Sequence, residues 1–183
     1  MSAGSVRAFF SVEVPVNALN FVGMGWLGAG YLRRVREDQR HITPAFLGDV
    51  SVGKIDALMG AISNFSFNKF MVHVKGTGMF SGSAKVIYAD VTEGRAELED
   101  MSTRLRSMAG SLGIRVERRE FVPHITLARV KDLKHEDEVL AHVMESADHE
   151  FGYFECSSVK LKKSVLKPEG PEYTDMFTVS ASP

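Results

Sequence analysis

The sequence predicts an α+β protein whose sheets are antiparallel. Segments with the period of a strand and segments with the period of a helix are intermixed along the chain. Several connections between them are too short for the crossovers that parallel strands require. Two His-Ile-Thr tripeptides, at positions 41–43 and 124–126, each lie in a short apolar run that is typical of a strand. The chain is therefore expected to place a repeated strand motif within a mixed antiparallel architecture.

Alternation, proline and glycine define the first elements. Apolar residues alternate with others over 6–14, which predicts a half-buried strand that Pro15 ends. A helix is expected over about 16–36, although each glycine between positions 23 and 30 costs a helix about 1 kcal/mol relative to alanine. Only tertiary packing could stabilise that helix, and a loop in part of the segment is the alternative. The first His-Ile-Thr strand is expected over 41–47, with the Gly-Asp pair at 48–49 ending it.

Helical spacing is clearest in the middle of the chain. Ser51 can cap a helix that carries Ile55, Leu58 and Ile62 on one side. Leucines and methionines recur at spacings of three and four between 98 and 112, with Gly113 as a C-terminal cap. A further helix is expected over about 133–146. Further strands are expected near 66–75, 84–91, 114–121, 124–130, 151–165 and 173–180, the last two joined by the turn-rich segment 167–171.

The composition excludes several classes of protein. A formal net charge of −1 over 183 residues lacks the positive field of a protein that coats nucleic acid. Basic residues do cluster at 33–40, 115–119 and 160–163, as a solvated face or as a rim that faces phosphate. Cys156 is the single cysteine, which excludes an internal disulfide and a multi-cysteine zinc site. We expect a soluble, cytoplasmic protein, because there is no signal peptide and no run of about 20 apolar residues.

The two tripeptides point to acid–base chemistry on a phosphate. In a strand, alternate side chains share a face, so His41 projects beside Thr43 and His124 beside Thr126. Two such strands brought together would form a cleft with two imidazoles and two hydroxyls. Cleavage of a phosphodiester needs one proton removed from water and one given to the leaving oxygen, and imidazoles do both near neutral pH without a metal. The two hydroxyls could donate hydrogen bonds to the non-bridging oxygens.

Four stretches extend this pattern over nearly the whole chain. They are RAFF at 7–10, HITPAFLG at 41–48, FVPHITLAR at 121–129 and SVLKPEGPEY at 164–173. In these stretches the sequence resembles the two-histidine phosphoesterase superfamily. More narrowly, it is similar to the RNA 2′,3′-cyclic phosphodiesterases historically called 2′-5′ RNA ligases.

The resemblance implies a fold, an activity and roles for particular residues. The implied fold is a single bilobal, pseudo-symmetric LigT-like domain over 1–183, with two antiparallel sheets lining a central groove and helices packed outside. His41 would be the general acid that protonates the leaving 3′ oxygen, and His124 the general base on water, leaving a 2′-phosphate. Thr43, Thr126 and Arg129 would hold the phosphate. The implied partners are RNA ends or nucleotides with a 2′,3′-cyclic phosphate; no cofactor, metal, membrane or obligatory protein partner is expected.

Some positions depart from that pattern or from a regular strand. Pro44 removes a ladder donor, so a bulge or an edge strand is expected just past Thr43. Arg129 would face away from His124 in a regular strand and reaches the phosphate only if the backbone bulges near Ala128. By alternation Phe46 faces away from His41 and is assigned to the core, with a role in base stacking left open. The glycine-rich segment 23–30 is also unlike the helix expected there.

Other patterns favour ordinary structural roles. The Gly-x-Gly-x-x-Gly pattern at 23–28 does not follow directly on the first strand, as a dinucleotide site requires. His135, His142 and His149 recur every seven residues, about 10.5 Å apart on a helix, which is too far to share a metal ion. They are expected to be exposed, His73 is expected to be structural, and Cys156 is expected to be a small, partly buried thiol.

Two alternative functions remain open at this stage. The first is the reverse reaction, in which RNA halves are joined through a 2′-5′ linkage. The second is a non-catalytic module that binds RNA ends, although a pure binder would not need two histidines and two threonines in this arrangement.

Overall fold

Two antiparallel sheets and the helices beside them make up the computed structural model, which describes residues 4–82, 85–117, 119–168 and 170–182. The four-stranded sheet consists of β1 (Ser5–Glu13), β3 (His41–Ser51), β8 (Ser158–Lys167) and β9 (Gly170–Ser180), in the order β3-β1-β8-β9. The five-stranded sheet consists of β2 (Leu32–Arg34), β4 (Phe70–Phe80), β5 (Val86–Glu93), β6 (His124–Val130) and β7 (Glu150–Cys156), in the order β2-β6-β5-β4-β7.

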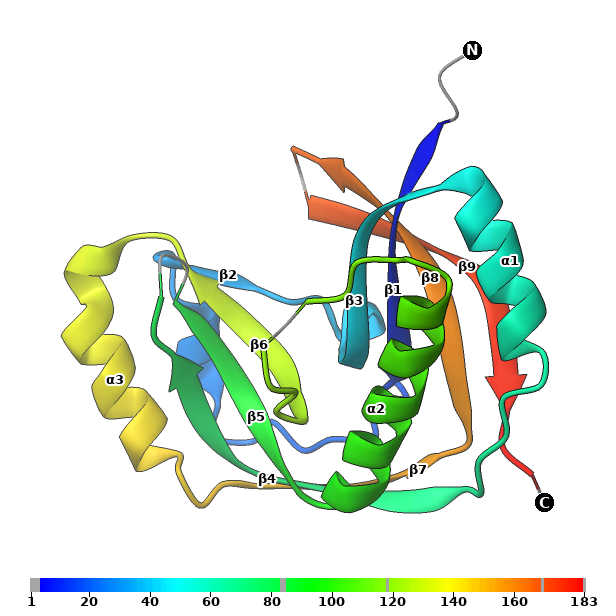
Figure 1. Ribbon diagram of the computed structural model, residues 1–183. Helices are drawn as coiled ribbons and strands as arrows, with labels where there is room; N and C mark the ends of the chain where they lie inside the picture. Colours follow the sequence, from blue (N-terminus) through cyan, green and yellow to red (C-terminus); the bar gives the residue numbers. More distant parts are fainter. Residues whose placement is uncertain (1–3, 83–84, 118, 169, 183) are drawn as a thin grey trace.

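Helices cover both sheets on the outside. The α-helices are α1 (Val52–Ile62), α2 (Arg95–Ser111) and α3 (Glu136–Glu145), and the 3₁₀-helices are η1 (Gly25–Gly28), η2 (Glu37–Gln39) and η3 (Leu133–His135). Helices α1 and α2 lie beside the four-stranded sheet, and α3 lies against the far part of the five-stranded sheet (Figure 1). Within the described ranges, no helix is long and apolar enough to cross a membrane. The predicted α+β class with two antiparallel sheets is confirmed.

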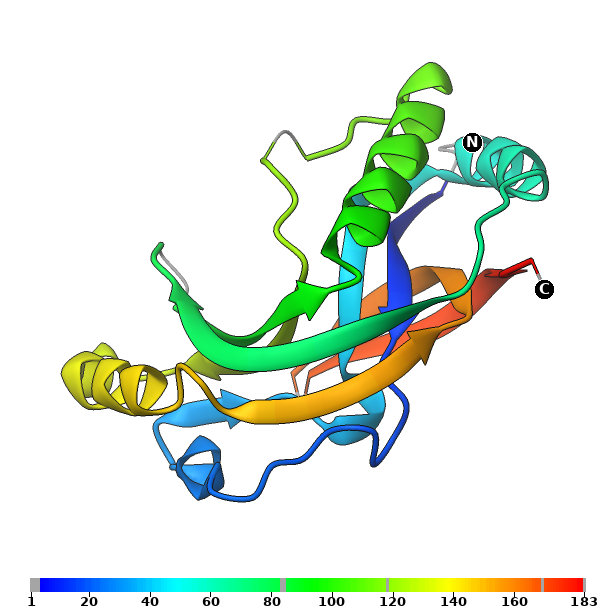
Figure 2. The same ribbon diagram turned by 90° about the horizontal axis from the view of Figure 1, so that it is seen from below.

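The chain crosses between the sheets several times. It forms β1 in the four-stranded sheet, then β2 in the five-stranded sheet, and then returns to the four-stranded sheet with β3. Strands β4 to β7 then build the five-stranded sheet, and β8 and β9 complete the first one (Figure 2). Strands β3 and β6, which carry the two tripeptides, contact each other where the sheets meet.

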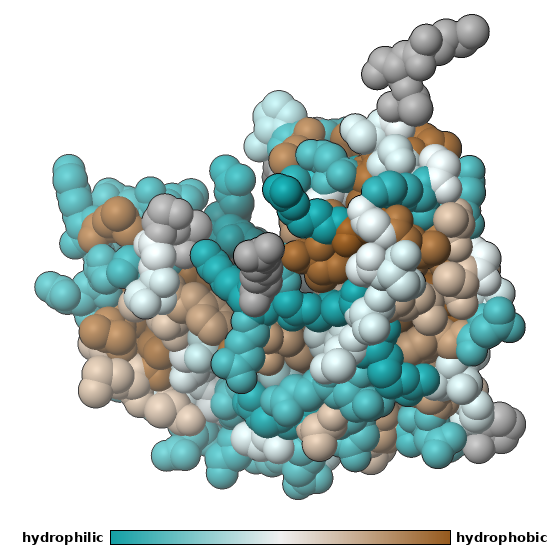
Figure 3. Space-filling model, in the orientation of Figure 1, coloured by the Kyte–Doolittle hydropathy of each residue, from teal (hydrophilic) through white to brown (hydrophobic). Residues whose placement is uncertain are grey.

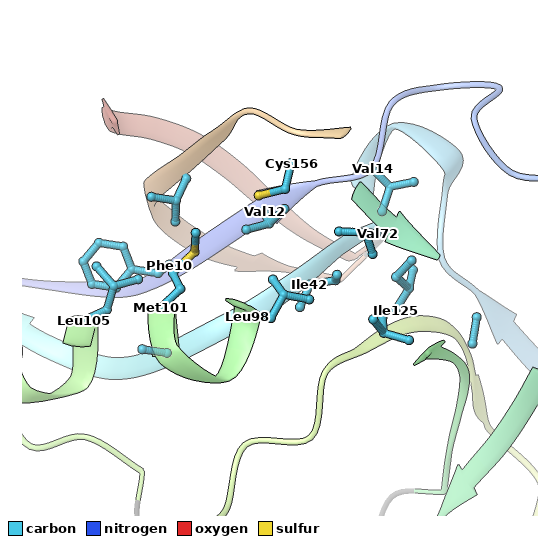
Figure 4. Close-up of a cluster of buried hydrophobic side chains, with 14 of the residues drawn as sticks. Phe10, Val12, Val14, Ile42, Val72, Leu98, Met101, Leu105, Ile125 and Cys156 are labelled. Atoms are coloured by element: carbon cyan, nitrogen blue, oxygen red, sulfur yellow. The ribbon is translucent and has the colours of Figure 1, made fainter. Parts of the chain in front are cut away.

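The core fixes which way the tripeptides face. Apolar side chains from both sheets and from α2 meet in one cluster, in which Ile42 and Ile125 lie near Leu98 (Figure 4). Each of these isoleucines is the middle residue of a tripeptide and is 0% exposed. Burial of each stabilises the fold by roughly 1.5–3 kcal/mol. Because the isoleucine points into the core, the histidine and the threonine on either side of it must point to the other face.

The helix expected over 16–36 is wrong. Within that range the chain has only η1, the short strand β2 and irregular segments. Gly23 has a φ of +84°, outside the helical region, and the buried Leu27 lies in the single 3₁₀ turn of η1, not in an α-helix. The Trp26 ring stacks on His142 of α3, with centroids 5.2 Å apart. Tertiary packing therefore holds this segment against α3 rather than as a helix.

Several boundaries also differ from those expected. The segment 151–165 is two strands in different sheets, β7 and β8, separated at Ser157. The first tripeptide strand continues past Gly48, whose φ of +65° accommodates an irregularity, and ends at Ser51. The described residues of 114–121 form no strand. Three residues of expected features lie outside the described residues: Ala84 of the strand 84–91, Arg118 of the basic cluster 115–119 and Glu169 of the connector 167–171.

Candidate active site

Each motif histidine is held in the same way at the start of its strand. His41 Nδ1 lies 2.7 Å from the carbonyl oxygen of Gln39, and His124 Nδ1 lies 2.6 Å from that of Val122. A carbonyl oxygen only accepts, so Nδ1 carries the proton and donates in both rings. In the neutral ring, Nε2 then holds the free lone pair, and within the described part of the chain neither Nε2 has a hydrogen-bond partner. Both rings are set to exchange a proton at Nε2.

A carboxylate stands opposite each histidine on the neighbouring strand. Glu13 of β1 pairs with His41, and Asp90 of β5 pairs with His124. Lys160 Nζ lies 2.6 Å from Glu13 Oε2, and Lys162 also forms an ion pair with Glu13. On the other side, Arg95 Nη2 donates to Asp90 Oδ1 at 2.7 Å.

Burial lowers the pKa of both imidazoles below their ordinary value of 6.5. The hydrogen bonds to the carbonyls of Gln39 and Val122 act in the opposite direction, and so do the negative charges of Glu13 and Asp90. A positive charge on His124 lowers the pKa of His41 further. The doubly protonated state is therefore disfavoured, and the pair holds at most one proton readily.

Two aromatic rings flank each imidazole. Phe9 and Tyr173 lie against His41, with ring centroids 5.2 Å and 5.4 Å away. Phe80 and Tyr88 lie against His124 at 4.8 Å and 5.5 Å, both with their planes steeply inclined to the imidazole. These contacts fix the rings and reduce their exposure to water, which is the main cause of the lowered pKa values.

A bulge follows the threonine of the first motif. Val12 pairs with Ile42 but Phe10 pairs with Ala45, so β3 has one residue more than β1 over this stretch. Pro44 and Ala45 are consequently both buried. The Ser102 hydroxyl of α2 donates to the Pro44 carbonyl at 2.5 Å. The irregularity expected just past Thr43 is present.

This bulge corrects the assignment of Phe46 to the core. Because two successive residues face inwards, the alternation changes phase and Phe46 returns to the face of His41. The Phe46 ring lines the same groove as His41 and Thr43, and the Arg7 guanidinium lies 4.8 Å from its centroid. Strict alternation could not reveal this, although the proline signalled that the strand was irregular.

The second motif has an equivalent bulge. Tyr88 pairs with Thr126 and Ile87 pairs with Ala128, so Leu127 is the extra residue on β6. Leu127 and Ala128 are both buried, and Arg129 returns to the groove face. Arg129 was expected to reach the site only if the backbone bulges near Ala128, and this bulge is present.

A groove of about 430 Å³ collects these side chains. His41, Thr43, Thr126 and Arg129 line it, and His124 lies beside it on the same face of β6 as Thr126. The molecule is visibly hollowed between the part that contains α3 and the part that contains α1 and α2 (Figure 3). Arg33, Arg34 and Arg36 of the basic cluster at 33–40 also line the groove, which favours the rim that faces phosphate over a solvated face. Sequence reasoning gave no role to two other lining residues, Arg7 and Tyr173. Arg7 and Tyr173 do lie in stretches that carry the family resemblance.

The remaining polar candidates lie outside this groove. His73 is buried and bonds to Glu150 at 2.6 Å and to Thr92 at 2.7 Å. His135 and His142 lie beside Glu138 and Glu145 on η3 and α3. In the described ranges no group of three or more metal-binding side chains is found. The glycine-rich segment packs on α3 and takes no part in the groove.

Known proteins resemble this chain in sequence and in fold. A family model described as the 2′-5′ RNA ligase superfamily matches residues 11–164. A protein of Methanothermobacter thermautotrophicus named RNA 2′,3′-cyclic phosphodiesterase is 32% identical over 179 residues, covering 93% of this chain and 96% of that protein. One of Aeropyrum pernix with the same name is 30% identical over 153 residues, covering 82% and 87%. The crystal structure of apo Escherichia coli LigT has a TM-score of 0.77 at 22% identity and covers 98% of this chain and 99% of its own.

Proposed function

The chain belongs to the 2′-5′ RNA ligase superfamily, and from this premise we propose that it is an RNA 2′,3′-cyclic phosphodiesterase that leaves a 2′-phosphate. The observation that carries the proposal is the matched geometry of His41 and His124. Both rings have their proton fixed on Nδ1 by a backbone carbonyl, both leave Nε2 without a hydrogen-bond partner among the described residues, and each shares a strand face with the threonine of its motif. Acid–base cleavage in line requires two such groups on opposite sides of one phosphorus atom.

The reaction is a balanced exchange of protons between the substrate and the two rings. Neutral His124 takes a proton from water at Nε2 while the water oxygen bonds to phosphorus. The bond from phosphorus to the 3′ oxygen breaks, and His41, protonated at Nε2, gives its proton to that oxygen. The product carries a 2′-phosphate and a free 3′-hydroxyl. His124 then releases its proton to solvent and His41 takes one up, which restores the starting state.

The other groove side chains stabilise the charge on the phosphate. Thr43 and Thr126 are the strand neighbours of the two histidines on the same face, and they line the groove. Their hydroxyls donate to the non-bridging oxygens, where negative charge must be held in the transition state. Arg129 adds a guanidinium, which binds phosphate oxygens in a bidentate manner.

Product identification tests the proposal directly. The purified protein is incubated with each of the four nucleoside 2′,3′-cyclic monophosphates, and the phosphomonoester is identified by chromatography against both isomers. We expect 2′-phosphates only, with the rate unchanged by EDTA because protein side chains carry out both proton transfers. Production of 3′-phosphates, or loss of turnover on chelation, would contradict the assignment.

Joining through a 2′-5′ linkage is a second candidate, because the family description itself names a 2′-5′ RNA ligase. In that reaction an RNA 5′-hydroxyl takes the place of water: it gives its proton to His124 and bonds to phosphorus, while the 3′ oxygen leaves with the proton of His41, so the same two histidines would serve. Transfer-RNA halves that carry a cyclic phosphate, incubated without a nucleoside triphosphate, would yield a joined product on a gel if ligation occurs. A mixture of hydrolysis and slow joining is compatible with the proposal, whereas joining without hydrolysis is not.

A further inference from the structure

The groove is much more basic than the chain as a whole. Five arginines line it, and none of the described residues that line it carries a carboxylate. The whole chain, in contrast, has a formal net charge of −1. The lining arginines are Arg7, Arg33, Arg34, Arg36 and Arg129. A single cyclic phosphate carries one negative charge, so this wall suits a substrate with more than one phosphate.

Two of these arginines stand directly opposite each other. Arg33 on β2 pairs with Arg129 on β6, so their side chains project from the same face of the sheet. Both side chains are exposed, and neither forms an ion pair with any residue in the described part of the chain. Like charges in directly opposed positions destabilise a sheet unless an anion lies between them. Arg36 differs, because Asp38 already holds its guanidinium through two hydrogen bonds of 3.0 Å and 2.7 Å.

Substrate chemistry identifies the anion. An RNA end that carries a 2′,3′-cyclic phosphate has its other phosphates only on the 5′ side of the terminal nucleoside. The next one is the phosphodiester that joins this nucleoside to its 5′ neighbour. Phosphate contacts from arginine position a nucleic acid without reading its sequence. In the proposed function Arg129 holds the reacting phosphate. Arg33, directly opposite Arg129 on the neighbouring strand, is therefore placed to bind the next phosphate of the same RNA.

We propose that Arg33, opposite Arg129, binds the phosphodiester on the 5′ side of the terminal nucleotide and so makes the protein prefer an oligonucleotide end to a mononucleotide. This proposal rests on the proposed function and names its substrate class. It assigns a binding role to β2, which is otherwise a short edge strand of three residues.

A pair of substrates that differ by one phosphodiester tests the proposal. The ratio of kcat/KM is measured for a dinucleotide that ends in a 2′,3′-cyclic phosphate and for the corresponding nucleoside 2′,3′-cyclic monophosphate. We expect the wild-type ratio to favour the dinucleotide and Arg33→Gln to lower that ratio by about tenfold, as for the loss of one charge-assisted hydrogen-bonded contact. For the dinucleotide, the slope of log(kcat/KM) against log salt should become shallower by about 0.7, one phosphate contact on a single strand.

Arg115→Gln is the matched control. It removes the same charge from another exposed arginine that does not line the groove, so the ratio should stay at the wild-type value. Arg33→Lys should keep part of the preference, because the charge remains while the planar fork is lost. A wild-type ratio of one, an equal loss for both substrates in Arg33→Gln, or an equal drop in the ratio for Arg115→Gln would overturn the proposal.

Equilibrium binding keeps this test independent of turnover. Were the wild-type protein inactive on both substrates, the proposed function would fail, but the arginine site could still be measured with a dinucleotide that ends in a 2′-phosphate. Weaker binding of this dinucleotide to Arg33→Gln, with unchanged binding of the nucleoside 2′-phosphate, supports the site. Equal binding of the dinucleotide to both proteins rejects it.

Discussion

The Tyr173 ring and the imidazole of His41 are nearly perpendicular, in a T-shaped contact with ring centroids 5.4 Å apart and planes at 87°. Tyr173 lies on β9 near the C-terminus, and His41 begins β3. Phe9 lies against both rings, at 5.2 Å from His41 and 5.0 Å from Tyr173. One proposed catalytic ring, on β3, is therefore oriented by residues from two other strands of the four-stranded sheet, β1 and β9.

Removal of the Tyr173 ring should impair the orientation of His41. We expect Tyr173→Ala to lower kcat by about twofold to twelvefold, equivalent to the roughly 0.5–1.5 kcal/mol that an aromatic pair contributes. Tyr173→Phe should remain close to wild type, because it keeps the edge contact. Exposure of His41 to water should also raise its pKa towards 6.5, so the alkaline limb of the pH–rate profile should move to higher pH. A purely structural role would leave that limb in place.

Replacement of either motif histidine should remove one proton transfer. We expect His41→Ala and His124→Ala each to lower kcat by about 10²–10⁴, with circular dichroism and the thermal midpoint close to wild type, because both rings lie at the groove face outside the apolar core. Should an alanine variant fail to fold, the corresponding glutamine variant provides the same test. His135→Ala is the control, since this ring lies on η3 outside the groove. Full activity in either motif variant would refute the mechanism.

The rate should have its optimum on the acid side of 6.5. His124 must be neutral to accept a proton and His41 must be protonated to donate one, and both pKa values lie below the ordinary 6.5. We expect a bell-shaped profile of kcat/KM whose two apparent pKa values belong to the coupled pair, with loss of activity at alkaline pH as the donor loses its proton. An optimum well above 7 for the free enzyme would show that the donor has a raised pKa.

The same lowered pKa values should make the fold less stable in acid. The unfolded chain binds protons at these imidazoles at higher pH than the native state does, so the free energy of unfolding falls as the pH falls through and below 6.5. Urea denaturation at several pH values measures this slope. The double variant His41→Gln, His124→Gln should flatten it, with the contribution of the carboxylates left unchanged.

The bulge after Thr43 depends on a hydroxyl from α2. Ser102 is buried and donates to the Pro44 carbonyl, and Ser102→Ala leaves that carbonyl without its partner. We expect a loss of about 1–3 kcal/mol in the free energy of unfolding, together with a lower kcat because Thr43 adjoins the bulge. Ser111→Ala, an exposed serine at the end of the same helix, should change stability by less than about 0.5 kcal/mol.

Cys156 should be inert in the native protein. Its side chain is 1% exposed, and burial raises the pKa of the thiol to about 12. Because the thiolate is the reactive form, an aromatic disulfide reagent at pH 8 should label the folded chain far more slowly than the urea-unfolded chain. Equal rates of labelling would show that β7 opens readily to solvent.

Local patterns predicted most of the regular elements. The strand 124–130 and the helix around 98–112 carry unambiguous periodicity, and the structure has β6 over His124–Val130 and α2 over Arg95–Ser111. The helix expected over 16–36 was wrong because apolar residues of this segment are buried against distant partners such as α3. The local spacing of apolar residues carries no information about such contacts. The single strand expected over 151–165 was wrong for a similar reason. Apolar and polar residues alternate in the same way in both parts of the segment, and only the pairing with other strands separates β7 from β8.

The site could be predicted in composition more than in geometry. The repeated tripeptide identified two histidines and two threonines, and the buried isoleucine between each pair fixes their common face. The phase change that brings Phe46 and Arg129 back to that face depends on an extra residue in each strand, which is visible only in the pairing register. The sequence left the basic cluster at 33–40 open between a solvated face and a rim that faces phosphate, because the position of β2 beside β6 is set by a pairing across almost a hundred residues.

The repeated crossing of the chain between the sheets makes the two halves of the molecule inseparable. The four-stranded sheet takes β1 and β3 from the first third of the chain and β8 and β9 from the last, while the five-stranded sheet takes β2 as well as the strands between. A cut at any central loop would deprive both sheets of strands at once. Recombination that exchanges one end of the gene would therefore alter both walls of the groove together, and neither wall can be inherited as a separate module.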